Sequence, residues 1–185
     1  MQVSALGNAL FTKTQQKVLG LLYGAPARTF YTNEIVRLAG VGIGSVKREL
    51  LIEKSQRKLH LIKDDVTFRS FDIALGIRPV GDKLAEGDFK TPEGRYTLDT
   101  RNPNSDFFLS IHVSYPSVRD RRAARQNGVD PGGAIMIHGQ PNTPTGSEAY
   151  YRTQDWTNGC IAVSNSDMID IWLMTGQNTP IEIRP

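Results

Sequence analysis

Two side chains of this sequence, Cys160 and His138, have the chemistry of a nucleophile and a general base. Cys160 is the single cysteine of the chain, and His138 ends a short apolar run. The thiolate is the attacking form of a cysteine, and a free thiol is mostly protonated at neutral pH. A histidine within hydrogen-bond distance can take the thiol proton, form an ion pair with the sulfur and later protonate a leaving amine. The two residues together predict cysteine-dependent acyl transfer.

Gly159, which directly precedes the cysteine, adds a second requirement of acyl transfer. Without a side chain, it lets a substrate approach and exposes the backbone N–H groups of Gly159 and Cys160. These two groups are candidate donors to the oxyanion of a tetrahedral intermediate. We therefore count Gly159 with the catalytic residues.

Less reactive roles for the same residues stay open at this point. Free cysteines are among the most buried residues, so Cys160 could belong to the core. His138 could form an ordinary hydrogen bond at the end of a strand. The two side chains could also bind a metal, but no paired His or Cys spacing and no carboxylate partner supports that. We expect neither a metal nor another cofactor.

The elements that must position these residues are predicted to be mostly strands. Apolar residues alternate with polar ones on both sides of a turn at 63–65, which predicts a hairpin within 59–75. Further strands are predicted at 95–98, 107–113, 134–137 and 179–184, a short basic helix within 117–133, and a helix capped by Ser164. The segment before Cys160 is predicted to be a loop. This pattern indicates a mainly β domain, like a sandwich or barrel, with a small helical segment at the N-terminus.

Composition excludes several other classes of protein. The chain has 185 residues, 39% of them hydrophobic, which is compatible with a packed core. No apolar run is long enough to span a membrane. A single cysteine excludes an internal disulfide and a four-thiolate zinc site. The opening residues lack the pattern of a secretory signal, so the chain as written is expected to stay in the cytoplasm.

The first 50 residues differ in charge from the rest. Residues 1–50 carry a net charge of +4 and residues 51–185 a net charge of −1. The pattern of residues 1–50 predicts two helices, a glycine turn and a basic helix, and it resembles a winged helix-turn-helix module that lacks its wing. Lys47 and Arg48 are the candidate DNA contacts, and weak nucleic-acid binding by a transcriptional regulator is one hypothesis. A packed helical appendage is the other.

Several motifs of residues 51–185 together resemble the L,D-transpeptidase catalytic domain, also called the YkuD domain. They are IEKSQRKLHLI, IALGIRPVGDKLAEGDFKTPEGRYTL, NPNSDFFLSIHVSYP, IHG, TNGCIAV and TPIEIRP, in this order. The resemblance implies a β-rich fold and a cysteine acyltransferase that acts on the stem peptides of bacterial peptidoglycan in the cell envelope. It also implies that Cys160 is the nucleophile and His138 the general base and acid.

The same motifs supply candidate substrate-binding residues. Gly139 belongs to the motif IHG, and Thr157 and Asn158 belong to the motif TNGCIAV. Trp156 could line a substrate groove or pack the loop, and His112 could face the pocket or form a structural hydrogen bond. Asn158 and Ala162 stand where many members have histidine and arginine, so a second histidine and an arginine clamp are not expected.

The implied reaction begins with attack of Cys160 on the carbonyl of the third stem residue, typically a diamino acid. D-Alanine leaves and a thioester remains. If an amine then attacks, the enzyme is a transpeptidase, and if water attacks, it is an L,D-carboxypeptidase. Both outcomes stay open. Either predicts that Cys160→Ala abolishes thioester formation and labelling by a carbapenem.

Overall fold

The computed structural model of the chain describes residues 48–185. The helix-turn-helix segment predicted for residues 1–47, including Lys47, lies outside the described residues. Within residues 48–185, no helix is long and apolar enough to cross a membrane. The compact unit that contains the described residues extends from Val46 to Pro185.

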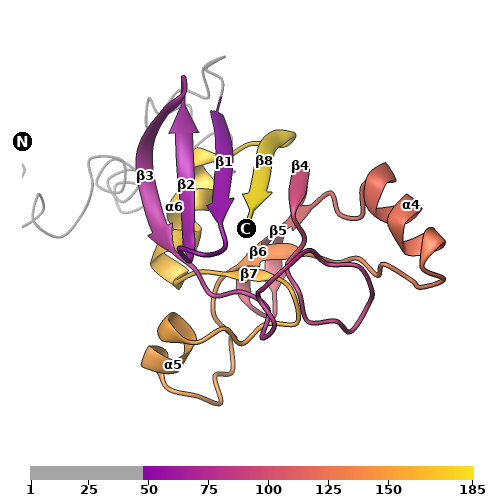
Figure 1. The fold of residues 1–185 in the computed structure, drawn as a ribbon. Helices are drawn as coiled ribbons and strands as arrows, with labels where there is room; N and C mark the ends of the chain where they lie inside the picture. Colours follow the sequence, from indigo (N-terminus) through magenta and orange to yellow (C-terminus); the bar gives the residue numbers. More distant parts are fainter. Residues whose placement is uncertain (1–47) are drawn as a thin grey trace, which may run out of the picture. The chain divides into compact units, whose positions relative to one another are not determined.

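The described chain is dominated by an eight-stranded sheet with the order β3-β2-β1-β8-β4-β5-β6-β7 (Figure 1). Figure 1 shows α6 behind β1 and β2, and α4 and α5 projecting at the margins. The expected mainly β fold is confirmed. The strands are β1 (Arg48–Glu53), β2 (Lys58–Lys63), β3 (Val66–Asp72), β4 (Gly94–Ser105), β5 (Phe108–Val113), β6 (Met136–His138), β7 (Ile161–Ala162) and β8 (Thr179–Arg184), and the helices are α4 (Val118–Gln126), α5 (Glu148–Thr153) and α6 (Asn165–Met174).

The hairpin of β2 and β3 is where the alternating pattern predicts it. Its turn residues Asp64 and Asp65 have φ values of 51° and 63°, the left-handed conformation that two-residue hairpin turns need. A register shift between Leu61 and Ile62 interrupts the pairing. After this bulge, Phe71 is buried while Phe68 is exposed, so the expected inward alternation holds only for the second half of β3.

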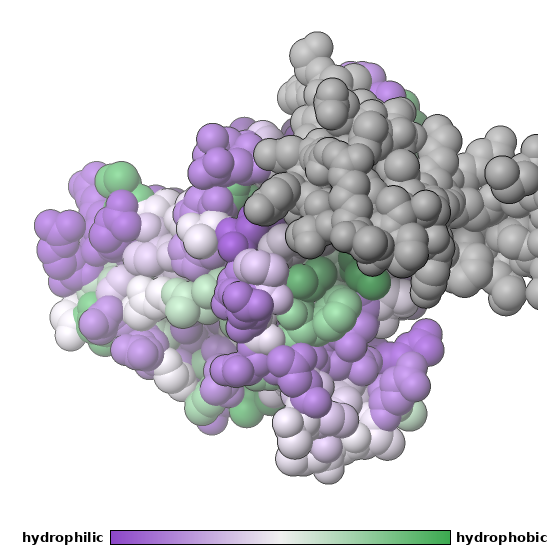
Figure 2. Space-filling model, turned by 180° about the vertical axis from the view of Figure 1, so that it is seen from behind, coloured by the Kyte–Doolittle hydropathy of each residue, from purple (hydrophilic) through white to green (hydrophobic). Residues whose placement is uncertain are grey.

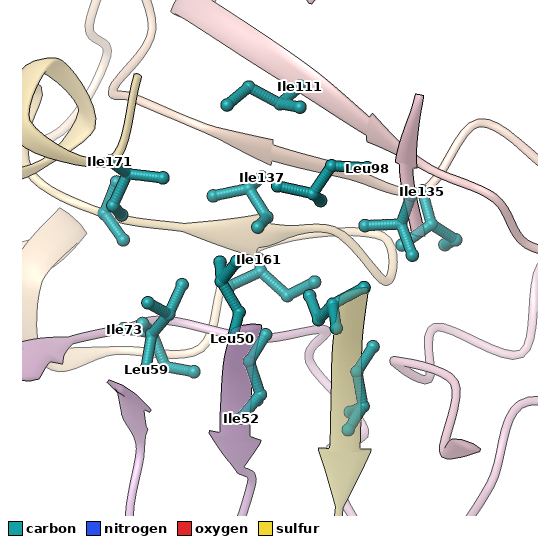
Figure 3. Close-up of a cluster of buried hydrophobic side chains, with 14 of the residues drawn as sticks. Leu50, Ile52, Leu59, Ile73, Leu98, Ile111, Ile135, Ile137, Ile161 and Ile171 are labelled. Atoms are coloured by element: carbon teal, nitrogen blue, oxygen red, sulfur yellow. The ribbon is translucent and has the colours of Figure 1, made fainter. Parts of the chain in front are cut away.

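Two parallel strand pairs join distant parts of the chain. β1 pairs in parallel with β8, and β6 pairs in parallel with β7. Side chains from both pairs meet in one core, in which Leu98, Ile111, Ile137 and Ile161 are fully buried (Figure 3). Burial of such side chains contributes roughly 1.5–3 kcal/mol each. The core thereby fixes β6, which ends at His138, and β7, which begins directly after Cys160.

Outside the core, polar side chains dominate the surface. From behind, hydrophilic residues cover most of the described surface, with smaller apolar areas among them (Figure 2). The large apolar residues that are well exposed include Val66, Val80 and Val118, which come from separate segments. Single exposed apolar residues of this kind are common in folded proteins.

Two predictions of local structure are wrong. Arg48 and Leu50 do not belong to a basic helix but to strand β1, and the Arg48 guanidinium donates a hydrogen bond to the Met174 carbonyl at 3.0 Å. Pairing with β2 and β8 overrides helix propensity here, so the helix expected to carry Arg48 into a DNA groove is absent from residues 48–50. The loop expected before Cys160 contains helix α5, capped by the Ser147 side chain.

Candidate active site

The parallel pair of β6 and β7 places His138 and Cys160 on neighbouring segments, with Cys160 just before the start of the pair and His138 at its end. His138 is the last residue of β6, and its register partner on β7 is Ala162. The Val163 N–H donates to the His138 carbonyl at 2.9 Å. Cys160 immediately precedes β7, two residues before Ala162. Since side chains two residues apart along a strand share a face, this register favours a common face for the thiol and the imidazole.

Both side chains line one open cavity of about 430 Å³. The cavity lies between the turn before β7, the strands β5 and β6, and the end of the β4–β5 hairpin. Its lining residues are Asn102, Asn104, Ser105, Asp106, Phe107, Ser110, Ala134, Met136, His138, Trp156, Thr157, Asn158 and Cys160. Of the predicted substrate-binding residues, Trp156, Thr157 and Asn158 are therefore at the cavity.

The surroundings of His138 keep its imidazole neutral. The side chain belongs to a residue that is 4% exposed, and burial lowers its pKa to about 4. Its Nδ1 lies 2.7 Å from the Gly139 carbonyl oxygen, which can only accept a hydrogen bond. Nδ1 therefore carries the proton, and Nε2 carries the lone pair. At neutral pH this residue can accept a proton, as a general base must.

Two aromatic rings hold the His138 ring in place. The Phe107 ring lies 4.7 Å from it between centroids at 45°, and the Trp156 ring lies 5.6 Å from it at 68°. The Trp156 indole N–H donates to the Tyr151 carbonyl of α5 at 3.1 Å. Helix α5 thus fixes Trp156, and Trp156 limits the rotation of the imidazole.

Cys160 rests as a thiol. Burial raises its pKa, while a backbone hydrogen bond at Met136 and the charge of Lys83 act in the opposite direction with less effect. The Sγ atom lies 3.6 Å from the Ala134 carbonyl oxygen, to which the thiol can donate. With a raised thiol pKa and a lowered imidazole pKa, the resting pair is neutral. The ion pair considered from the sequence is therefore not the resting form of the two residues.

Gly159 has a conformational role that the sequence did not reveal. Its φ is 127°, and a Cβ atom built on it would lie 2.6 Å from the Lys90 carbonyl oxygen. Its N–H donates to the Thr157 hydroxyl at 3.1 Å, and that hydroxyl donates to the Cys160 carbonyl at 2.7 Å. The Gly159 N–H is thus occupied, which contradicts its expected role as a free oxyanion donor. Within residues 48–185, the Cys160 N–H has no acceptor.

Two other predicted site residues lie beside the cavity rather than in its lining. The His112 Nδ1 lies 2.7 Å from the Asp99 carboxylate on the neighbouring strand, which is the structural hydrogen bond that we considered as the alternative. Gly139 supplies the carbonyl that holds His138, and a Cβ atom on it would lie 2.5 Å from Asn165 Oδ1. Gly139 therefore orients the imidazole instead of contacting a substrate in this pocket.

An ion pair anchors the turn that presents Cys160. Asp155 accepts hydrogen bonds from the Arg57 Nε and Nη2 atoms at 2.8–3.1 Å and from the Leu75 N–H at 2.9 Å. This paired guanidinium–carboxylate geometry is stronger than a single contact. Sequence reasoning missed it, because Arg57 lies far from Asp155 along the chain and no local pattern connects them.

Sequence reasoning also missed the β4–β5 side of the cavity. Phe107 contacts the imidazole, and Asn102, Asn104 and Asp106 line the pocket beside it. The motif NPNSDFFLSIHVSYP contains these residues, but its sequence does not indicate that they line a pocket. Within residues 48–185, no group of three or more His, Cys, Asp or Glu side chains could hold a metal ion.

Comparison with known proteins identifies a family for this chain. The model of the L,D-transpeptidase catalytic domain, YkuD, matches residues 47–183. The Escherichia coli (strain K12) protein YafK is 34% identical over 62 residues, which are 32% of this chain and 23% of YafK. The helical cell shape determining protein Pgp2 of Campylobacter jejuni is 25% identical with a TM-score of 0.59, over 76% of this chain and 48% of that structure.

Two further solved structures agree in fold. Bdellovibrio bacteriovorus Bd1075 has a TM-score of 0.55 and 26% identity, over 75% of this chain and 48% of that structure. An L,D-transpeptidase from Mycobacterium smegmatis has a TM-score of 0.50 at 12% identity, which shows the fold alone, over 76% of this chain and 59% of that structure. The chain spans about half the length of Pgp2 and Bd1075 and about a quarter of YafK. By the match over residues 47–183, this chain belongs to the L,D-transpeptidase catalytic domain (YkuD) family.

Proposed function

We propose that this protein is a cysteine acyltransferase that acts on peptidoglycan stem peptides through Cys160 and His138. One observation carries the proposal, namely that a thiol and a neutral imidazole line the same open cavity. Family membership supports the substrate class. The protein Pgp2, which is similar in fold, is described as determining helical cell shape, and this supports a role in the cell envelope.

In the first half of the reaction, Cys160 Sγ attacks the carbonyl carbon of the third stem residue. His138 Nε2 takes the thiol proton as the carbon–sulfur bond forms, and the carbonyl oxygen becomes an oxyanion. The Cys160 N–H, which has no acceptor within residues 48–185, is the donor that we assign to this oxyanion. The intermediate collapses, the bond to D-alanine breaks, and the imidazolium returns its proton to the leaving amine.

In the second half, an amine or water attacks the thioester. His138 takes a proton from the attacking group, and the Cys160 thiolate leaves and is protonated again. We assign the amine of a neighbouring stem as the acceptor, which makes the product a cross-link. The water-accepting L,D-carboxypeptidase is the other outcome of the same chemistry.

The neutral resting pair has a consequence for this mechanism. A buried thiol beside a neutral imidazole is a weak nucleophile until a substrate enters. The ion pair then forms while the substrate carbonyl is in place, so proton transfer and attack are coupled.

Product analysis of purified variants tests the proposed reaction. The protein is incubated with a tetrapeptide stem that ends in D-alanine, with and without a second stem as acceptor. We expect D-alanine release and a cross-linked dimer from the unaltered protein, neither from Cys160→Ala, and both at a much lower rate from His138→Gln. His60→Gln serves as a control, because His60 lies on β2 outside the cavity lining. D-alanine release without a dimer identifies the carboxypeptidase, and D-alanine release by Cys160→Ala contradicts the proposal.

A further inference from the structure

The charge of the cavity points to the kind of substrate that it accepts. Among the described residues that line it, Asp106 is the one acidic residue, and His138 is neutral. None of these described lining residues is a lysine or an arginine. Ala162 occupies the position where an arginine clamp was considered. The lining formed by residues 48–185 therefore presents a carboxylate and no cation to a bound peptide.

Asp106 lies at the tip of the β4–β5 hairpin, defined here as Ser105–Phe108. One residue, Asn142, holds this tip through three hydrogen bonds. Its side-chain amide donates to the Ser105 carbonyl at 2.9 Å, its side-chain carbonyl accepts from the Phe108 N–H at 2.9 Å, and its own N–H donates to the Asp106 carbonyl at 2.9 Å. The backbone that carries the carboxylate is thus fixed before a ligand arrives.

The tip is also tied to the residues that position the nucleophile and the base. The Phe107 carbonyl accepts a hydrogen bond from the Gly139 N–H at 3.1 Å, and Gly139 in turn accepts from His138. The Phe107 ring contacts the imidazole. The backbone that carries Asp106 therefore has a defined position relative to His138, as a specificity-determining residue requires.

The Asp106 carboxylate is available to bind a ligand. None of the ion pairs formed within residues 48–185 involves it, whereas Asp155, Asp170 and Asp88 are each paired with a basic side chain. An ionised carboxylate accepts hydrogen bonds only, and its strongest partners are cationic donors. A primary ammonium on a flexible side chain is such a partner.

We propose that the Asp106 carboxylate binds the side-chain ammonium of the stem residue whose carbonyl Cys160 attacks, so that the site selects cationic acyl donors over neutral ones. This inference rests on the proposed function. It assigns the ammonium to the acyl donor and not to the acceptor, because an acceptor amine must lose its proton before it can attack the thioester, and pairing with a carboxylate would keep that proton in place.

A comparison of two donors tests the assignment. One is a tetrapeptide with L-lysine at position three and D-alanine at position four, and the other carries Nε-acetyl-L-lysine instead. Single-turnover acylation of Cys160 is followed by intact mass without any acceptor. At low ionic strength we expect the lysine peptide to react about 10-fold faster, which is the effect of one charge-assisted hydrogen bond. The preference should shrink as salt screens the interaction.

Three variants separate a specific role from a structural one. Asp106→Asn keeps the side-chain shape and should reduce the preference to about 1-fold by slowing only the lysine peptide. Asp72→Asn removes an exposed carboxylate outside the cavity lining and should keep the full preference. Asn142→Ala frees the hairpin tip and should lower the preference in part. Alkylation of Cys160 by uncharged iodoacetamide should be unchanged in Asp106→Asn, which shows that the site remains folded.

The remaining outcomes distinguish a failure of this inference from a failure of the proposed function. If neither peptide acylates the unaltered protein, the proposed function fails and this inference fails with it. If both peptides react equally, or if Asp106→Asn keeps the preference, the inference is wrong while the proposed function stands. If Asp106→Asn slows only aminolysis of a preformed thioester, the carboxylate serves the acceptor, and the assignment to the donor is wrong.

Discussion

Replacement of Thr157 by valine tests how the turn before β7 holds the nucleophile. The Thr157 residue is 4% exposed, and its hydroxyl forms hydrogen bonds with the Gly159 N–H and the Cys160 carbonyl. Valine preserves the branched shape and removes the hydroxyl. The variant therefore leaves a buried N–H without its acceptor and a carbonyl without its donor. Thr157→Ser keeps both hydrogen bonds and is the matched control.

The expected loss of stability follows from these two hydrogen bonds. A buried N–H left without a partner costs about 1–3 kcal/mol, and the second lost hydrogen bond about 1 kcal/mol. The free energy of unfolding should fall by about 2–4 kcal/mol in Thr157→Val. For a chain of this size, that lowers the melting temperature by about 5–15 °C.

The same change should slow acylation, because the Cys160 carbonyl loses the contact that fixes the peptide unit beside the thiol. We expect about a 10-fold lower rate of carbapenem acylation at a temperature where the variant is folded, since small displacements of a nucleophile reduce rates strongly. Urea unfolding measures stability, and intact mass measures acylation. A Thr157→Val protein with the urea midpoint and acylation rate of the unaltered protein would refute this account of the turn.

Three further changes have defined outcomes. Gly159→Ala forces a side chain into a φ of 127° and against the Lys90 carbonyl, so we expect a loss of about 3–5 kcal/mol in urea unfolding, and full stability would contradict the close approach. The free energy of unfolding should rise between pH 4 and 6.5, because burial lowers the pKa of His138 to about 4 while the unfolded imidazole titrates near 6.5. The gain of about 3 kcal/mol should be absent from His138→Gln. An equal gain in that variant would exclude His138 as its source. Arg57→Met breaks the pairing with Asp155 and should lower both the melting temperature and the acylation rate. Arg57→Lys should show a smaller loss in both quantities. Acylation at the full rate in Arg57→Met would show that the ion pair does not position the turn.

Local patterns predicted the elements whose formation depends on neighbouring residues. The final strand at 179–184 and the hairpin of β2 and β3 occupy the expected positions, and Ser164 caps α6 as predicted. In each case the signal is a turn, a cap or an alternation within about ten residues. The basic helix α4 was predicted from a cluster of arginines that is followed by glycines and a proline.

Long-range pairing explains what local patterns missed. Arg48 and Leu50 have spacing that suits a helix, but β1 is held between β2 and β8. The contribution of Phe107 and Asp106 to the cavity depends on how β4 pairs with β5 and how β5 pairs with β6, which no local signal encodes. The occupied Gly159 N–H depends on one hydroxyl of Thr157 and is equally invisible in the sequence.

Intact-mass analysis of the acylated protein tests the central claim most directly. The unaltered protein is mixed with a tetrapeptide stem, the reaction is stopped within one turnover, and the adduct is located by peptide mapping. The account predicts a mass increase equal to the stem without its terminal D-alanine, on Cys160, with a much slower increase in His138→Gln. An adduct on another residue, or an equal rate in His138→Gln, would contradict the pairing of thiol and imidazole.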